Sequence, residues 1–387
     1  MSIAKQGKYQ FDIQTGNNFE LLIDGKQFFP TMLDAINGAK KTIMLEQYLM
    51  RSGKIAKRFI DALLKAKQRE VDVFILLDDY GSSALEQADR DRLVNGGIKL
   101  WFYNPIRLKH LQRNFFRDHR KILIIDHSDV FVGGAGITDE FSSEFKGQQA
   151  WHDVMLKIQG LIVHDWVQLF HQTWQHCSNT SLTIPESNTQ RCSADMTGRI
   201  LTTAPLHPQE INRALLRRLT RAKQRIWITT PYFVASQKIR RHLRHAARRG
   251  LDVRLLLPGP HNDHPWIGYA ARRYYLRLLR YGVRIFEYQP RFTHAKIELC
   301  DDWTSLGSSN LDRWNQRWNL DANQAVYDKE FAQHITRYFK HDFAQSQEIL
   351  FDDWKQRPWL TRVREHIAGQ LMYLLERVGR SSYRRRK

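Results

Sequence analysis

Two copies of one short motif contain the residues whose types and spacing best suit chemistry. Each copy reads His-x-Lys and, after four further residues, Asp; the members are His119, Lys121 and Asp126, and His294, Lys296 and Asp301. One copy is a weak signal, because three specified positions match by chance on the order of once in 10⁴ starting positions. Two copies with the same spacing are a strong signal of a shared function.

The residues around each motif predict a β-strand, which orients the side chains. The segments read KILIID and KIELCD, and residues two apart on a strand face the same side. If the two copies meet, two imidazoles and two ammonium groups surround a phosphodiester. One neutral imidazole attacks phosphorus, the other protonates the leaving oxygen, and the lysines neutralise the non-bridging oxygens. The sequence contains no cluster of metal-ligand spacing, so neither metal nor cofactor is expected.

Turns of small residues follow each motif and suit an anion. They span residues 133–138 and 307–312, and their backbone N–H groups could face a phosphate. We therefore expect phosphate contacts from Gly134, Ser308 and Asn310.

Four aspartates are further candidates. Asp153 and Asp321 lie 34 and 27 residues after the motif histidines, and such carboxylates can fix the tautomer of a catalytic imidazole. Asp126 and Asp301 complete the motifs and are counted with the catalytic set, although their position directly after each strand favours an anchoring role in the following loop. A lone histidine in a strand is usually structural, but the duplication favours catalysis for His119 and His294.

The order of segments is also duplicated, which predicts the fold. Tyr48 matches Tyr232 at an offset of 184 residues, and Asp72 matches Asp252 at an offset of 180. Near-constant offsets over a long stretch indicate an internal repeat. Strand and helix patterns alternate in each half, so we predict two similar α/β halves with mixed sheets packed about a pseudo-two-fold axis. The expected boundaries are 1–190, 191–345 and a C-terminal tail over 346–387.

The tail predicts a basic amphipathic helix from about residue 359 to 378. Its apolar residues recur every three or four positions and are Leu360, Val363, Ile367, Leu371, Leu374 and Val378. Such a helix either lies in a membrane interface or packs its apolar stripe on the protein. The sequence leaves both alternatives open.

The net charge of the chain predicts an anionic binding partner. The chain has 60 Lys and Arg against 40 Asp and Glu, a net charge of +20, which favours nucleic acid or anionic lipid. Between residues 211 and 285, eighteen basic residues face only two acids. No apolar run is long enough to span a bilayer, and the first residues do not resemble a signal peptide. Three scattered cysteines predict neither disulfides nor a zinc site, and a cytoplasmic setting follows.

These motifs resemble the phospholipase D superfamily and, within it, the bacterial cardiolipin synthases that lack N-terminal transmembrane helices. The resemblance rests on the paired motifs and on ITTPYFV (228–234), RYGVRIFEYQP (280–290) and the segments at 294–312 and 319–328. It implies one active site between the halves, a covalent phosphatidyl-histidine intermediate, and crosswise orientation of the histidines by Asp153 and Asp321. The sequence departs from the family at Gly136, where Asn is usual, and at Asp321, where Glu is common.

The resulting prediction is a phosphatidyltransferase that makes cardiolipin from two phosphatidylglycerol molecules and releases glycerol. We expect it at the cytoplasmic face of the bacterial inner membrane, bound peripherally to anionic phospholipid and without an obligate protein partner. The alternative is a phosphodiesterase that hydrolyses phospholipid or nucleic acid. Nucleic acid is the less favoured substrate, because superfamily nucleases are typically short chains with one motif. A polyanion-binding module with a relic site is a third alternative, disfavoured because both motifs are intact.

Overall fold

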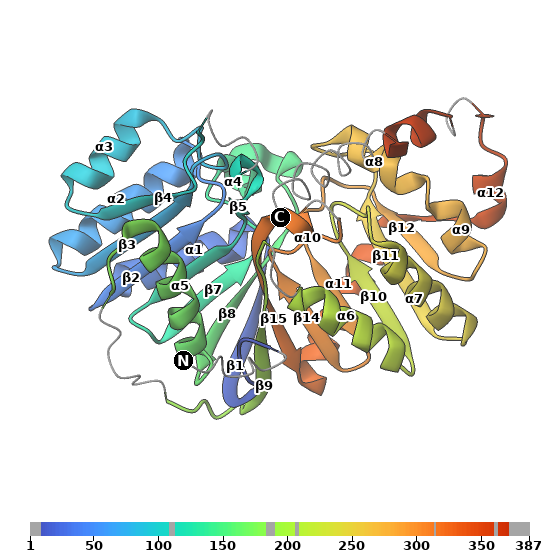
Figure 1. Cartoon of the computed structure of the whole chain (residues 1–387), viewed down its shortest axis with the longest axis horizontal. Helices are drawn as coiled ribbons and strands as arrows, with labels where there is room; N and C mark the ends of the chain where they lie inside the picture. The colour runs from blue at the N-terminus through green and yellow to red at the C-terminus, as the bar shows by residue number, and fades with distance from the viewer. Residues whose placement is uncertain are drawn as a thin grey trace, which may run out of the picture.

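The computed structural model describes residues 9–107, 113–182, 190–205, 209–312, 315–359 and 363–370. Within these residues, sixteen strands form one mixed sheet that runs through the whole molecule (Figure 1). The two halves meet at its centre, where β1 (Gln14–Ile23) pairs antiparallel with β9 (Met196–Thr203). The sheet is therefore shared by both halves.

The strand order is repeated on the two sides of this central pair. Outward from β1 come β8 (Val154–Gly160), β7 (Asp129–Gly133), β6 (Lys121–Ile125), β2 (Thr42–Gln47), β3 (Asp72–Asp78) and β4 (Lys99–Tyr103). Outward from β9 come β15 (Asn319–Tyr327), β14 (Trp303–Gly307), β13 (Ile297–Cys300), β10 (Arg225–Thr229), β11 (Asp252–Pro258), β12 (Arg284–Tyr288) and β16 (Ser346–Ile349). The short β5 (Arg117–Asp118) pairs with β15. The matching order is the structural form of the sequence repeat.

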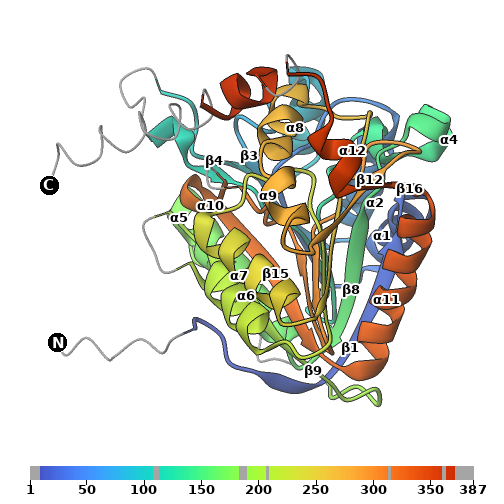
Figure 2. The same ribbon diagram turned by 90° about the vertical axis from the view of Figure 1, so that its right-hand side faces the viewer.

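Helices cover both faces of the sheet, which explains the continuous apolar strands (Figure 2). In the first half they are α1 (Gly25–Gly38), α2 (Lys54–Gln68), α3 (Gln87–Asn95), α4 (Ser143–Lys146) and α5 (Val163–Ser178). In the second half they are α6 (Glu210–Arg221), α7 (Gln237–Arg248), α8 (Pro265–Arg272), α9 (Tyr275–Leu279), α10 (Asn315–Trp318), α11 (Lys329–Ala344) and α12 (Phe351–Lys355). Every residue of β6 is buried, as expected for a strand covered on both faces.

Helix ends and helix faces follow from the local sequence. Ser236 caps α7 by accepting a hydrogen bond from the backbone N–H of Ile239, and Asp328 caps α11 in the same way. Ile239, Leu243 and Ala246 form the buried stripe of α7, as their spacing predicts.

The segment after residue 345 differs from the predicted tail. β16 pairs with β12, and Ile349 and Trp354 are buried in the core of the second half. These residues extend the second half because β16 covers the outer edge of β12, which would otherwise expose unpaired backbone groups. Among the described residues, no helix is long and apolar enough to cross a membrane.

Candidate active site

The two motif histidines lie at one end of the sheet, immediately before β6 and β13. Lys121 is paired with Gln47 at the end of β2, and Ile297 is paired with Thr229 at the end of β10. Both histidines are buried. Equivalent strands of the two halves therefore deliver both motifs to the same end of the sheet.

Backbone hydrogen bonds join each motif to the opposite half. The N–H of His119 donates to the carbonyl of Leu320 at 2.9 Å, and the N–H of His294 donates to the carbonyl of His152 at 2.7 Å. Leu320 and His152 directly precede the two candidate orienting acids in the sequence. The backbone of each motif histidine is therefore bonded to the residue that precedes an orienting carboxylate of the other half.

The carboxylates bond the imidazoles crosswise. Nδ1 of His119 is 2.9 Å from Oδ1 of Asp321, and Nδ1 of His294 is 2.7 Å from Oδ2 of Asp153. A carboxylate only accepts, so each Nδ1 carries the proton and each Nε2 keeps a lone pair. The shorter Asp at position 321 still reaches its histidine. This geometry suits one nucleophilic and one proton-transferring imidazole.

Gly134 and Ser308 support these carboxylates. The Ser308 hydroxyl donates to Oδ1 of Asp321 at 2.8 Å. A Cβ at Gly134 would lie 2.5 Å from Oδ2 of Asp153, so only glycine leaves room for that carboxylate. The N–H of Gly134 also points to the carbonyl of Val154, at 3.4 Å. Sequence reasoning expected both residues at the phosphate, whereas their contacts in the structure are with the orienting acids or their neighbours.

The two lysines lie beside their own histidines and are buried. Nζ of Lys121 donates to the carbonyl of His119 at 2.5 Å and lies 4.9 Å from the centre of the Tyr48 ring. Nζ of Lys296 donates to the carbonyl of His294 at 2.6 Å and lies 3.0 Å from each ring nitrogen of that histidine. Burial, and then the charge of Lys296, lower the pKa of Lys121 to about 7, while burial lowers the pKa of Lys296 to about 8.

Both imidazoles are neutral at pH 7 in this environment. Burial and the neighbouring Lys121 lower the pKa of His119 to about 4, although Asp321 opposes the shift. Burial and Lys296 also lower the pKa of His294, against the effect of Asp153. The two histidines and two lysines of the motifs are buried close together, so a positive charge on one of them disfavours a positive charge on the others. An anion between them would reverse that effect.

Asn310 is a buried polar side chain whose hydrogen bonds are unmade. Neither its amide oxygen nor its amide nitrogen has a hydrogen-bond partner among the described residues. Such a group costs free energy unless a ligand or water satisfies it. In the first half, a Cβ at Gly136 would lie 2.8 Å from the Leu49 carbonyl. The two turns are therefore unequal, and the amide donor comes from the second half.

Asp126 and Asp301 lie at the far ends of β6 and β13. The Asp126 carboxylate accepts hydrogen bonds from the backbone N–H groups of residues 40, 41 and 42. The Asp301 carboxylate does the same for residues 223, 224 and 225. Both aspartates anchor the start of a neighbouring strand, and their place among the catalytic residues is corrected accordingly.

Aromatic side chains form walls around the histidines. The Tyr48 ring is 4.8 Å from the His119 ring, and the Trp151 and Phe141 rings are 5.5 and 5.7 Å from the His294 ring. Sequence reasoning gave these aromatic residues no role at the site. The repeat offset singled out Tyr48, which was the one available signal.

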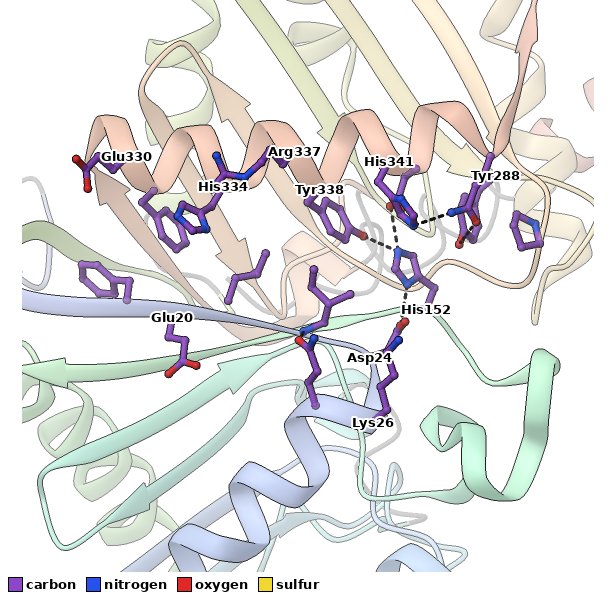
Figure 3. A pocket seen from close by; sticks show the side chains of 18 of the residues that line it. Glu20, Asp24, Lys26, His152, Tyr288, Glu330, His334, Arg337, Tyr338 and His341 are labelled. Atoms are coloured by element: carbon purple, nitrogen blue, oxygen red, sulfur yellow. Dashed lines mark hydrogen bonds and ion pairs between the residues drawn. The ribbon is translucent and has the colours of Figure 1, made fainter.

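His152, whose carbonyl accepts the hydrogen bond from the N–H of His294, is the centre of a buried ionic cluster. The His152 ring is 2.7 Å from Asp24 and 3.0 Å from Asp342, and it stacks between Tyr288 and Tyr338. Figure 3 shows it beside a pocket of roughly 860 Å³ between α11 and β1. Although burial opposes it, Asp342 and Asp24 raise the pKa of His152 to about 9. A protonated His152 therefore ties α11 of the second half to the first half.

The chain is similar over most of its length to known proteins. The family model described as "Cardiolipin synthase, PLD-like domain" matches residues 32–174 and 215–343. Cardiolipin synthase B of Salmonella typhimurium is 35% identical over 354 residues, covering 88% of this chain and 82% of its own. Cardiolipin synthase of Clostridium perfringens is 31% identical over 364 residues, covering 91% and 76%.

One solved structure supports the fold. Phosphatidylserine synthase of Haemophilus influenzae superposes with a TM-score of 0.73 at 15% identity, over 92% of this chain and 94% of its own. The predicted fold class, two similar α/β halves of the phospholipase D type, is confirmed.

The His152 cluster predicts a pH-dependent contribution to stability. The pKa of His152 is raised from 6.5 to about 9, so its contribution is fully present below pH 6.5 and is lost as the pH rises through 9. At 1.36 kcal/mol per unit, the contribution is on the order of 3 kcal/mol. The difference in urea-unfolding free energy between wild type and His152→Gln should therefore shrink from pH 6.5 to 10. The exposed His334→Gln on α11 is the matched control, and an H152Q difference that stays constant over this range would contradict the charge assignment.

Proposed function

The chain belongs to the cardiolipin synthase family with a PLD-like domain, and from that premise we propose that it is a phosphatidyltransferase acting on phosphatidylglycerol. It moves a phosphatidyl group to the glycerol headgroup of a second phosphatidylglycerol, giving cardiolipin and free glycerol. The proposal rests mainly on the pair of imidazoles, each held through Nδ1 by an aspartate of the other half. The names of the relatives support the choice of substrate.

In the first step, Nε2 of His119 attacks phosphorus and the bond to the glycerol oxygen breaks. His294, as imidazolium, gives its Nε2 proton to that oxygen. The low pKa of His119, about 4, keeps this nucleophile neutral. A phosphodiester carries one negative charge, and its arrival between Lys121 and Lys296 favours protonation of His294. The substrate itself therefore prepares the acid.

In the second step, the neutral His294 takes the proton of an acceptor hydroxyl. The hydroxyl oxygen bonds to phosphorus, and the phosphorus–nitrogen bond to His119 breaks. The lysines and the Asn310 amide hold the non-bridging oxygens in both steps. Water as acceptor would give phosphatidic acid instead, so the identity of the acceptor decides between transfer and hydrolysis.

The central experiment is to incubate labelled phosphatidylglycerol vesicles with wild type, His119→Ala and His294→Ala. Each variant should fall below a few per cent of wild-type turnover, because the proposed mechanism uses one imidazole as the nucleophile and the other as the acid. Acid quenching of wild type should leave the label on the peptide that contains His119. Label on the His294 peptide reverses the two roles, and phosphatidic acid alone or cleavage of added DNA alone identifies the alternative phosphodiesterase.

The lysines predict the alkaline limb of the pH profile. Their pKa values of about 7 and about 8 mean that positive charge is lost from the free enzyme as pH rises through this range. Bound phosphate favours the charged lysines, so the limb of kcat should lie at higher pH than the limb of kcat/KM. Steady-state rates from pH 5.5 to 10 measure both, and coincident limbs would contradict the prediction.

We also propose that the catalytic end of the sheet faces a lipid surface. Trp266 on α8 is 58% exposed, and Ile367 in the helical segment 363–370 is also 58% exposed. The segment packs along α8, with the Arg364 guanidinium 4.1 Å from the Tyr269 ring. Because α8 follows β11, whose parallel neighbour β10 ends beside the second motif, these side chains lie toward the catalytic end.

The described part of the predicted tail helix bears on this surface. Val363 and Ile367 are exposed, whereas Ala368 is buried. Leu360, Leu371, Leu374 and Val378 lie outside the described residues. Exposed apolar side chains beside arginines suit an anionic bilayer interface, where each basic residue contributes on the order of 1 kcal/mol. Location at the cytoplasmic face of the bacterial inner membrane remains part of this proposal.

The double variant Trp266→Ala/Ile367→Ala should weaken sedimentation with phosphatidylglycerol vesicles by about tenfold, because two interfacial side chains are lost. Residual binding through arginines should fall steeply with added salt. Trp101→Ala, which removes an exposed tryptophan from β4, is the matched control. Equal binding by the double variant and wild type would place the lipid contact elsewhere.

A further inference from the structure

A carboxylate outside both motifs, Asp263, has no role in the mechanism above. It lies beside the seam, which is the place between the two halves where the histidines and lysines of the two motifs meet. It is in the segment that joins β11 to α8. Its Oδ2 accepts a hydrogen bond from the Tyr232 hydroxyl. Its Oδ1 is buried and has no hydrogen-bond partner among the described residues. A buried carboxylate oxygen without a hydrogen-bond donor indicates that a ligand supplies the donor.

Two observations place Asp263 close to the reacting groups. Tyr232 follows β10, whose Thr229 pairs with Ile297 next to Lys296. The negative charge of Asp263 also acts on the second motif, where it raises the pKa of His294 and of Lys296 against the effect of burial. Asp263 therefore borders the site from the second half.

In the first half, both carboxylate oxygens of the acid that ends β3 accept hydrogen bonds. Asp78, at the end of β3, accepts hydrogen bonds from the backbone N–H groups of Gly81 and Asp118, and from the Arg117 guanidinium. Its carboxylate is committed to holding the loop. Asp78 therefore has no spare oxygen like that of Asp263, and the two lipids of the proposed reaction need different surroundings.

We propose that Asp263, with Tyr232, binds the hydroxyl groups of the glycerol headgroup of the acceptor lipid and so selects transfer over hydrolysis. This inference rests on the proposed function. During attack, the reacting hydroxyl gives its proton to His294 as its oxygen bonds to phosphorus. The neighbouring hydroxyl donates to Oδ1 of Asp263 and keeps its proton.

The acceptor atoms of the site match a pair of hydroxyl groups. The Asp263 carboxylate would also accept a hydrogen bond from an ammonium group, and transfer to an ethanolamine lipid distinguishes the two donors in the test below. A vicinal diol has two neutral donors, and the pair of Asp263 Oδ1 and Tyr232 Oη has two acceptor atoms. The chemical class of the ligand is therefore a polyol headgroup.

The test is the partition of the phosphatidyl group between cardiolipin and phosphatidic acid in Asp263→Asn. This variant keeps the size of the side chain but removes its charge. The ratio of cardiolipin to phosphatidic acid should fall roughly tenfold, the effect of losing a hydrogen bond to a charged group. Release of headgroup glycerol, which reports formation of the intermediate, is measured in the same assay and separates a loss of turnover from a change in partition. Added free glycerol should divert the intermediate to phosphatidylglycerol with a KM about tenfold higher than in wild type.

Controls separate this role from a structural one. Asp302→Asn, an exposed acid in the turn after β13, should leave the ratio unchanged. If Asp263→Asn is poorly folded by thermal unfolding, Tyr232→Phe gives the same readout, with the ratio lowered in the same direction. A fall in total turnover at constant ratio in both variants overturns the assignment.

Three further outcomes would each contradict the inference. Faster transfer to an ethanolamine lipid than to phosphatidylglycerol, lost in Asp263→Asn, overturns the polyol assignment in favour of an ammonium ligand. Normal cardiolipin formation with an unchanged ratio in Asp263→Asn overturns the inference alone. A wild-type protein that releases only phosphatidic acid, whatever glycerol is added, overturns both the inference and the proposed function.

Discussion

The crosswise bond between the imidazole of each motif and a carboxylate of the other half is the constraint on which the rest of the structure depends. His119 needs Asp321, and His294 needs Asp153. Neither half alone contains a complete pair. The central β1–β9 pairing and the short β5–β15 ladder hold the halves in the register that these bonds require. Buried His152, between Asp24 and Asp342, adds an ionic tie directly behind the same seam.

Burial of four basic groups is the second feature that organises the site. Two lysines and two histidines share one seam, and burial lowers the pKa of all four. A bound anion would stabilise the charged forms of these groups. Asn310, in the turn that follows the second motif, has an amide group without hydrogen-bond partners among the described residues. The phosphodiester of the proposed reaction would supply that negative charge, and preorganised positive groups of this kind stabilise a transition state electrostatically.

The halves repeat a fold but differ in detail at the seam. Gly136 has no space for the amide that Asn310 supplies in the second half. Asp78, the last residue of β3, uses both carboxylate oxygens to hold its loop, whereas Asp263 keeps one oxygen free. In the proposed reaction His294 gives a proton to the leaving group of the donor lipid and then takes a proton from the acceptor lipid. The differences between the two sides of the site allow it to bind these two lipids one after the other.

The sequence by itself determined the two motifs and the class of fold. Spacing of two residues on a strand places His119 beside Lys121, and His294 beside Lys296, because strand geometry is local. A near-constant offset between repeats likewise predicted two similar halves without any knowledge of their contacts. The tertiary structure decided which acid meets which imidazole, since those partners are 202 and 141 residues apart in the chain. It also moved Asp126 and Asp301 to the far ends of their strands, gave Ser308 and Gly134 to the orienting acids, and brought Asp263 to the seam. Contacts of this kind depend on how the sheet closes, and the periodicity of a single segment contains no information about that closure.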